Sequence, residues 1–297
     1  MTTHTSRTST EIASQPGCWE RAADLAPGSQ GALPRPGERV AVVGCGTSWF
    51  MAKAYAALRE RAGQGETDAF PASEMPAGRR YDRIVALTRS GTTTEVLGLL
   101  KEQRGHTPTV ALTAAPQTPV VDVADELIAL PFADEESVVQ TRFATSALAL
   151  LRASLGQDLS RAAADAHTAL EAPVEELAAL EQVTFVGTGW TVGLADEAAL
   201  KMREAAQRWT ESYPAMEYRH GPLAIGEPGR AVWVFGPAPE GLAADVERTG
   251  ARLVTSDLDP MAHLVLAQRV AVAAAERQGL DPDRPRHLTR SVILDPS

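Results

Sequence analysis

The sequence predicts an α/β protein built around parallel β-sheets. Residues 39–60 and 81–101 each combine a run of β-branched residues, a glycine-containing turn and a helical pattern. Further short strands are expected at residues 108–114 and 125–131. Strands that alternate with helices form βαβ units, and the strands of such units pair in parallel. The length of 297 residues predicts two domains, because a domain typically takes roughly 150 residues.

The N-terminal region is expected to play no part in function. The first ten residues are rich in Thr and Ser and lack an apolar period, which predicts a disordered tail. Residues 10–26 fit a short helix that is broken at Pro16, and the Gly- and Pro-rich residues 27–37 fit a loop. The functional part of the chain is therefore expected to follow this region.

Composition and charge exclude several classes of protein. No apolar run approaches the roughly 18 residues that span a bilayer, and the first residues lack the apolar centre of a signal peptide. We therefore predict a cytoplasmic protein with no membrane partner. Cys18 and Cys45 are too few for a disulfide framework, and no Cys/His cluster has metal-ligand spacing. A formal net charge of −10 argues against a nucleic-acid partner, whereas backbone N–H groups and hydroxyls can still bind a small anion.

An internal repeat divides the chain. The Gly-x-Gly turns at Gly44 and Gly187 lie 187 − 44 = 143 residues apart, and the residues after them match at a hydroxyl, an alanine and a closing Arg-Glu pair. Residues 141–182 are rich in Ala, Leu and Glu and predict a helical connection between the halves. The repeat indicates duplication of one α/β unit, although Ala-rich helices resemble one another easily and part of the match can be coincidence.

A turn rich in hydroxyl groups, residues 88–94, is a candidate binding site, and we call it the hydroxyl loop. A strand is expected to end there and a helix to begin, so unpaired N–H groups of the first helical turn lie beside hydroxyl side chains. This arrangement can cradle a phosphate group, whereas an ordinary Ser/Thr-rich turn with an N-cap explains the stretch alone equally well. The hydroxyl side chains belong to Thr88, Ser90, Thr92, Thr93 and Thr94.

Two further observations favour the phosphate interpretation. Ser48 follows the first predicted strand, and in a doubly wound sheet the ends of neighbouring strands share one crevice. The corresponding turn of the second half, residues 235–241, carries no hydroxyl group, so a single anion site is expected.

The Gly44 turn lacks the third glycine and the acidic residue of a nicotinamide dinucleotide site. Cys45 in this turn is interpreted as a small buried residue rather than as a nucleophile.

Residues 201–221 read as a helix that runs into a loop, with an acid on the helix and a histidine on the loop. Glu197, Lys201 and Glu204 have the spacing of one helix face, and a solvated, salt-bridged face is the usual explanation for such a trio. The alternative places Glu204 at a ligand with Lys201 beside it. His220 precedes a rigid turn, and a lone loop histidine is more often structural or exposed. Spacing alone assigns a function to neither Glu204 nor His220.

Four motifs in this order, VVGCGTS, TRSGTTTE, ALKMRE and EYRHGPLA, resemble the SIS (sugar isomerase) family. The resemblance is to the double-domain isomerase half of glucosamine-6-phosphate synthase and its relatives, and it runs from about Thr10 to Val292. It implies an α/β fold of two tandem SIS domains, each a parallel β-sheet flanked by helices in a flavodoxin-like three-layer sandwich. The implied division is a tail and helix at 1–28, a phosphate-binding SIS domain at 29–158 and a catalytic SIS domain at 159–297.

The resemblance also implies the residues of an active site. Glu204 matches the glutamate that moves a proton between C1 and C2, and Lys201 matches an orienting charge. His220 matches the histidine that opens the sugar ring, which in this family comes from the neighbouring subunit of a homodimer. No metal or organic cofactor is expected. The implied phosphate ligands are Ser48, Thr88, Arg89, Ser90 and Thr93, and the implied sugar contacts are Gly46, Thr47 and Gln140.

Several positions depart from the family pattern. Arg290 stands where the synthase has a lysine that forms an imine with a ketose, and an arginine stays protonated and cannot be that nucleophile. It can still bond to an oxygen or an enediolate. Gln140 and Arg142 replace a serine and a lysine, Arg89 replaces a glutamine, and Thr92 replaces an acid. Sugar specificity is therefore expected to differ.

The resemblance leaves three functions open. A hexosamine or N-acetylhexosamine 6-phosphate that loses its C2 proton can be isomerised or deaminated, and this outcome leads because more of the matched relatives carry it out. The same intermediate can instead expel the C3 substituent, as in the relative that removes lactate from N-acetylmuramic acid 6-phosphate. A non-catalytic sugar-phosphate sensor is the third function. An ammonia-channelling synthase is not expected, because no room for a glutamine-hydrolysing domain precedes residue 10.

Overall fold

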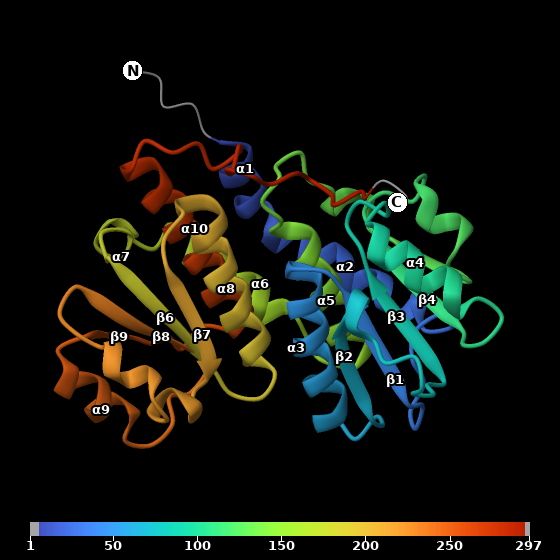
Figure 1. The fold of residues 1–297 in the computed structure, drawn as a ribbon, viewed down its shortest axis with the longest axis horizontal. Helices are drawn as coiled ribbons and strands as arrows, with labels where there is room; N and C mark the ends of the chain where they lie inside the picture. Colours follow the sequence, from blue (N-terminus) through green and yellow to red (C-terminus); the bar gives the residue numbers. More distant parts are fainter. Residues whose placement is uncertain (1–5, 295–297) are drawn as a thin grey trace. The chain divides into compact units, whose positions relative to one another are not determined.

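The computed structural model describes residues 6–294 and contains two parallel β-sheets, each enclosed by helices (Figure 1). The chain divides into two compact units. The first-sheet unit contains residues 17–159 and 288–294, and the second-sheet unit contains residues 6–16 and 160–287. The expected bounds of the tandem domains stay predictions, and the last described residues group with the first sheet.

The first sheet has five parallel strands in the order β2-β1-β3-β4-β5. β1, β3 and β4 are fully buried, which is the pattern of central strands covered on both faces. The four strands predicted in this half are confirmed, and β2 is an additional edge strand. The strands are β1 Val40–Gly44, β2 Thr67–Pro71, β3 Arg83–Leu87, β4 Thr109–Thr113 and β5 Glu126–Ala129.

Helices cover both faces of the first sheet, so this unit has three layers. Ala41 and Val43 of β1 join a buried cluster with Val96 and Leu100 of α4. Because side chains alternate along a strand, the intervening residues of β1 face the opposite side, where α3 packs against β1 and β2 and α5 packs against α3. The helices are α3 Thr47–Arg61, α4 Thr94–Gln103 and α5 Arg142–Ser154.

The second sheet has four parallel strands in the order β7-β6-β8-β9. α8 and α10 pack against one face, and α9 covers the other through a buried cluster that includes Val232, Val234 and Val246. The prediction of parallel sheets flanked by helices is therefore confirmed. The elements are β6 Gln182–Gly187, β7 Thr210–Pro214, β8 Arg230–Phe235, β9 Arg252–Val254, α8 Thr191–Ala206, α9 Leu242–Thr249 and α10 Pro260–Arg277.

The sequence interpretation of residues 201–221 as a helix running into a loop is wrong in part, because β7 follows α8 closely. Thr210 Oγ1 donates to the Ala199 carbonyl, and Ser212 Oγ donates to Asp196 Oδ1, each at 2.8 Å. These hydroxyls tie β7 to the polar side of α8. β7 is a short edge strand without an apolar run, so its sequence does not predict a strand.

The N-terminal segment is helical from residue 7, contrary to the predicted tail. Ser6 caps α1 (Arg7–Ala13) by accepting a hydrogen bond from the Ser9 N–H. Asp283 accepts a second bond, at 2.8 Å, from the Thr8 N–H in the first turn of the helix. The part of the predicted tail before Ser6 lies outside the described residues.

A second N-terminal helix, α2 (Gln15–Ser29), replaces the predicted broken helix. The break falls at Ser14 rather than at Pro16, because a proline is tolerated in the first turn of a helix. α2 also takes in residues 27–29, which were predicted as loop. The helical connection predicted between the halves is confirmed by α5, α6 and α7. The remaining elements are α6 Ser160–Glu171, α7 Glu175–Ala178, η1 Ala72–Glu74, η2 Pro119–Asp122, η3 Pro131–Ala133, η4 Glu217–Arg219 and η5 Pro222–Ile225.

The two Gly-x-Gly turns have the same local geometry. A Cβ atom at Gly44 would lie 2.7 Å from the carbonyl carbon of Ser48, and a Cβ atom at Gly187 would lie 2.3 Å from the carbonyl oxygen of Thr191. Both glycines therefore allow a helix to begin directly against the end of its strand. The sequence repeat thus corresponds to a repeated strand–turn–helix arrangement.

Between residues 6 and 294, no helix has both the length and the apolar character needed to cross a bilayer. The same residues contain no group of three or more His, Cys, Asp or Glu side chains arranged to hold a metal ion. Within the described residues, neither Cys18 nor Cys45 forms a disulfide.

The buried His263 predicts a pH dependence of stability. Its ring on α10 lies 4.9 Å from the ring centroid of Trp233 and 5.3 Å from that of Phe235. Burial lowers the pKa of His263 from 6.5 to about 4, so between these pH values the unfolded chain binds a proton more readily than the folded chain. This residue should therefore reduce the free energy of unfolding by about 3 kcal/mol as the pH falls from 7 to 4.

Chemical denaturation of the wild type and His263→Leu over this pH range measures the effect. The variant should lose stability less steeply below pH 6.5, since leucine binds no proton. Carboxylates with a lowered pKa, such as that of Asp283, affect both proteins alike and cancel in the difference. Parallel curves for the two proteins would contradict the assignment to His263.

Candidate active site

The hydroxyl loop joins the end of β3 to the start of α4, as predicted. Thr88 and Ser90 are buried, and the Thr88 hydroxyl has no hydrogen-bond partner among residues 6–294. Thr93 occupies the N-cap position of α4, yet its side chain makes no capping bond. An ordinary N-capped turn would use that side chain, so the geometry favours the anion-binding interpretation.

The turn after β1 lies at the same edge of the sheet as the hydroxyl loop. β1 and β3 are adjacent parallel strands, and Val43 near the end of one pairs with Ala86 near the end of the other. Thr47 and Ser48 are buried in the first turn of α3. The expectation that this turn and the hydroxyl loop follow neighbouring strands is therefore correct. Gly46 is the exposed residue just before α3 and has a positive φ of 53°.

The C-terminal segment packs on the hydroxyl loop, which the sequence did not reveal. Ser291 Oγ lies 3.0 Å from Ser90 Oγ, 2.9 Å from Thr92 Oγ1 and 3.5 Å from Thr93 Oγ1. Figure 1 shows this red segment beside α4. The LTRSV motif places Ser291 next to Arg290, and that proximity was the available signal in the sequence.

Arg89 was predicted to bind phosphate, but its guanidinium bonds to protein oxygens. Nη1 donates to Glu135 Oε2 at 3.4 Å and to the Ser137 carbonyl at 3.2 Å. Nη2 donates to the Val138 carbonyl at 3.3 Å and to the Arg290 carbonyl at 2.8 Å. Arg89 therefore holds the 135–138 turn and the C-terminal segment together. Phosphate binding by this side chain stays a prediction.

Glu135 organises the turn that carries Gln140. Its carboxylate is fully buried, and Oε1 accepts bonds from the Thr141 N–H at 2.5 Å, the Thr141 hydroxyl at 2.8 Å and the Arg142 N–H at 2.7 Å. A carboxylate at this place caps the N-terminus of α5 and complements the helix dipole. Gln140 is half-buried just before the helix. Sequence reasoning missed Glu135 because an acid in a polar loop reads as exposed.

The Arg290 guanidinium also bonds to oxygen atoms of the protein. Its Nη2 bonds to Asp134 Oδ1, and its Nε donates to the Glu135 carbonyl at 3.0 Å. The permanently charged guanidinium of Arg290 thus makes structural contacts, and a catalytic role for it stays a prediction.

The trio on α8 is buried rather than solvated, which corrects the interpretation favoured by spacing. The side chains of Lys201 and Glu197 are each 1% exposed and that of Glu204 is 18% exposed. Lys201 Nζ lies 2.5 Å from Glu204 Oε2 and 3.4 Å from Glu197 Oε1. The ion pairs hold the partly accessible Glu204 carboxylate in a fixed position on a rigid helix.

The His220 ring is not bonded to the Glu204 carboxylate in the described residues. His220 is exposed between η4 and η5, and its backbone N–H donates to the Glu217 carbonyl at 2.9 Å. Within residues 6–294, no hydrogen bond or ion pair joins its ring to Glu204. The structure therefore does not join these two predicted catalytic groups by a hydrogen bond or an ion pair.

Cys45 sits half-buried in the turn after β1. Burial, reinforced by the nearby negative charge of Glu95, raises the pKa of this thiol. A raised pKa reduces the thiolate fraction, so the interpretation of Cys45 as a structural rather than a nucleophilic residue is supported.

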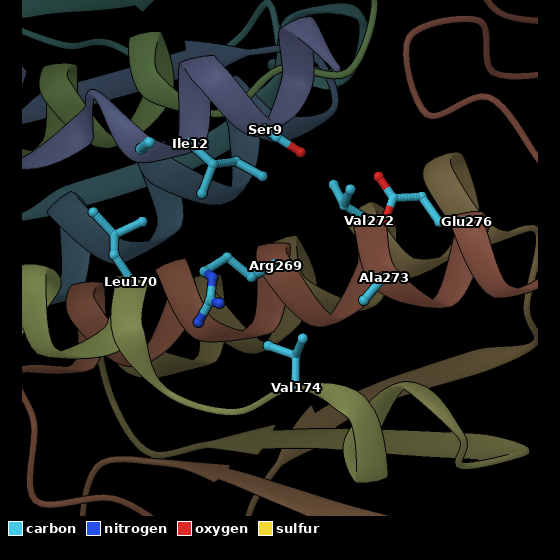
Figure 2. Close-up of a pocket in the computed structure, with 9 residues that line it drawn as sticks. Ser9, Ile12, Leu170, Val174, Arg269, Val272, Ala273 and Glu276 are labelled. Carbon is cyan, nitrogen blue, oxygen red and sulfur yellow. The ribbon is translucent and has the colours of Figure 1, made fainter. Parts of the chain in front are cut away.

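A surface pocket of about 280 Å³ in the second-sheet unit is formed by other residues (Figure 2). Ile12 of α1 and Val272 of α10 supply apolar walls, and Arg269 of α10 also lines the pocket. The Arg269 guanidinium donates to the Ala169 and Ala172 carbonyls at 2.7 and 2.6 Å. The cation thus satisfies the C-terminal end of α6, and none of the predicted site residues lines this pocket.

Replacing Lys201 by methionine should destabilise the protein by about 3 to 5 kcal/mol, because two carboxylates would lose their buried counter-charge. Lys101→Met is the matched control, since Lys101 is exposed on α4 and its loss should cost less than about 1 kcal/mol. Urea denaturation measures both. Equal losses would show that Lys201 does not neutralise a buried group.

Comparison with curated proteins finds similarity along most of the chain. The sequence is 27% identical over 297 residues to the isomerizing glutamine–fructose-6-phosphate aminotransferase of Sulfurisphaera tokodaii. This alignment covers 87% of the chain and 50% of the relative. The chain therefore spans about half the length of the curated relatives that it matches.

Solved structures share the fold at lower identity. Glucosamine-6-phosphate deaminase of Thermotoga maritima matches with a TM-score of 0.81 at 23% identity, covering 97% of this chain and 100% of that one. The C-terminal domain of glucosamine-fructose-6-phosphate aminotransferase from Francisella tularensis matches with a TM-score of 0.80 at 20% identity, covering 95% and 99%. At these identities the likeness establishes the fold.

The family comparison addresses the first sheet directly. Residues 35–155 match the family described as the SIS domain, and this range contains β1 to β5, the hydroxyl loop and the Glu135 turn. The second sheet lies outside the matched range. We therefore identify residues 35–155 as a SIS domain, in a chain that resembles the isomerase half of glutamine–fructose-6-phosphate aminotransferase and glucosamine-6-phosphate deaminase.

Proposed function

We propose that this protein is a phosphosugar-processing enzyme that acts on a hexosamine or N-acetylhexosamine 6-phosphate. It opens the sugar ring, removes the C2 proton and completes an aldose–ketose isomerisation or a deamination. The observation that carries the proposal is the buried group of Glu197, Lys201 and Glu204, in which Glu204 alone keeps partial access to solvent.

Burial of this charged group favours a catalytic role over a structural one. Moving charges out of water is costly, and well-packed apolar residues usually stabilise a core at least as well as a buried ion pair. A solvated helix face, the ordinary explanation of the trio, is incompatible with the 1% exposure of Lys201. A carboxylate fixed by an ion pair on a rigid helix is suited to move a proton between adjacent carbons.

The hydroxyl loop is assigned to the phosphate end of the substrate. Its buried Thr88 hydroxyl lacks a protein partner among the described residues, and the Thr93 side chain at the N-cap of α4 makes no capping bond. Hydroxyls and first-turn N–H groups together suit a phosphate. Ser48, Arg89 and Ser90 complete the proposed set.

The second sheet is proposed to be a second SIS domain. Its first strand, β6, lies between β7 and β8, just as β1 lies between β2 and β3. The glycine turns after β1 and β6 also have matching close approaches to the following helix. The proposed tandem arrangement assigns phosphate binding to the first domain and the proton-transferring Glu204 to the second.

His220 is proposed to open the sugar ring from a neighbouring subunit of a homodimer. Its exposure and the lack of a bond to Glu204 support this assignment. Ring opening must come first, because only the free aldehyde acidifies the neighbouring C–H bond. Glu204 then takes the C2 proton, and protonation at C1 converts an aldose to a ketose. From an amino sugar the product is a ketimine, which water converts to the ketose and ammonia.

Elimination at C3 is the second candidate function, and Arg290 favours it. A guanidinium that bonds to Asp134 and the Glu135 carbonyl cannot form an imine with a ketose. If the C2 nitrogen is acetylated, it leaves poorly as an amide, so the intermediate would expel the C3 substituent instead. The similarity to an isomerizing aminotransferase and to a glucosamine-6-phosphate deaminase supports the first candidate.

Glucosamine 6-phosphate or its N-acetyl form should exchange its C2 proton for deuterium in the presence of the enzyme. Glu204→Gln should abolish this exchange while inorganic phosphate still binds, because the amide cannot accept the proton. Glu247→Gln, an exposed change on α9, should exchange normally. NMR in heavy water measures exchange and separates ketose plus ammonia from a C2–C3 alkene.

Two outcomes of this experiment would count against the proposal. Exchange that persists in Glu204→Gln would mean that another group is the base. The absence of exchange with every hexose and hexosamine phosphate would favour the sugar-phosphate sensor.

A mixture of Glu204→Gln and His220→Ala proteins should recover part of the activity that each lacks alone. If His220 serves the neighbouring subunit, a mixed dimer contains one site in which both groups are intact. Activity is measured after co-refolding or prolonged incubation of the two variants, and each variant incubated with itself is the control. Failure to recover in a verified mixed dimer would place both groups in one chain.

A further inference from the structure

The C-terminal residues 288–294 occupy the features of the hydroxyl loop that suit an anion. We propose that this segment, which we call the strap, is an internal competitor that an anionic ligand must displace from the hydroxyl loop. The inference rests on the proposed phosphate-binding function of that loop. It adds a regulatory contact, because the strap restricts access to the loop until a ligand arrives.

The side-chain contacts show the competition most directly. The hydroxyls of Ser90, Thr92 and Thr93 converge on one oxygen, Ser291 Oγ, at 3.0, 2.9 and 3.5 Å. Distances of 2.9 to 3.0 Å are direct hydrogen bonds and leave no room for another oxygen between the partners. A phosphate oxygen that received the same three hydroxyls would therefore take the place of Ser291.

The backbone of the strap occupies the end of α4 in the same way. The Thr94 N–H, at the first position of the helix, donates to the Val292 carbonyl at 3.2 Å. The Leu294 N–H donates to Thr94 Oγ1 at 2.9 Å. First-turn N–H groups have no partner within their helix and are the groups that bind anions. The strap thus supplies a carbonyl and a hydroxyl where a phosphate would supply charged oxygens.

The strap has a fixed end and a releasable end. At Arg290 the guanidinium bonds to the Asp134 carboxylate and the Glu135 carbonyl, and the Arg290 carbonyl accepts from the Arg89 guanidinium. These charge-assisted bonds anchor the start of the strap. From Ser291 onward the bonds to the loop are between neutral groups.

Little apolar burial holds the releasable end. Val292, Ile293 and Leu294 are 50%, 67% and 56% exposed. The segment therefore depends on neutral hydrogen bonds, each of which is weaker than a hydrogen bond to a charged phosphate oxygen. A dianionic ligand should win the competition and swing the strap about Arg290.

Inorganic phosphate titrated into the wild type, Ser291→Ala and Thr10→Ala tests the strap by calorimetry. Ser291→Ala removes the competing hydroxyl and should bind phosphate about fivefold more tightly. Thr10→Ala should bind like the wild type, because Thr10 is exposed on α1 and its hydroxyl donates to the Ser6 carbonyl and not to the hydroxyl loop. Binding by Ser291→Ala that equals or is weaker than the wild type would overturn the strap while leaving the phosphate site intact.

Hydrogen exchange of the strap amides provides a second measurement on the unmodified protein. Saturating phosphate should increase exchange at Leu294, whose N–H would lose its acceptor on Thr94. Unchanged or slower exchange with phosphate bound would contradict displacement. If no variant binds phosphate, both the phosphate site and the strap are wrong, which distinguishes that failure from failure of the strap alone.

Discussion

The buried ion pairs of Lys201 are the constraint on which the second-sheet unit depends. α8 packs against α10 and against β6 and β7, so any charge on its inner face is removed from water. Such a charge persists only when an opposite charge is within reach, and Glu197 and Glu204 provide it within one helical face. The same arrangement leaves Glu204 partly accessible. The ion pairs of Lys201 therefore both neutralise the buried charges and hold the proposed catalytic carboxylate of Glu204 in place.

The first-sheet unit depends on a different network, which joins three stretches that are distant in sequence. Arg89 of the hydroxyl loop bonds to the Glu135 carboxylate, and Arg290 of the strap bonds to the Glu135 carbonyl. Because Glu135 also caps α5, its burial fixes the turn that carries Gln140. The loop that is proposed to bind phosphate thus takes its position from residues that do not themselves need to touch a ligand.

Comparison of the two sheets suggests how one architecture supports two tasks. Gly44 and Gly187 allow the same close approach of helix to strand, yet the residues beyond them differ in kind. In the first unit the next strand end leads into hydroxyls at the start of α4, whereas in the second unit the notable chemistry lies on the inner face of α8. The proposed function therefore assigns the anchoring of an anion to the first-sheet unit and the transfer of a proton to the second-sheet unit.

The sequence alone determined the parallel sheets, four strands of the first half and the hydroxyl turn, because buried β-branched runs and glycine turns are local signals. It did not predict β7, whose residues pair with β6 without forming an apolar run. Spacing alone favoured a solvated face for Glu197, Lys201 and Glu204, since spacing is the same whether a face meets water or another helix. Only tertiary structure decided their burial, the role of Glu135 and the contact of Ser291 with the hydroxyl loop, because each depends on which distant segment packs alongside.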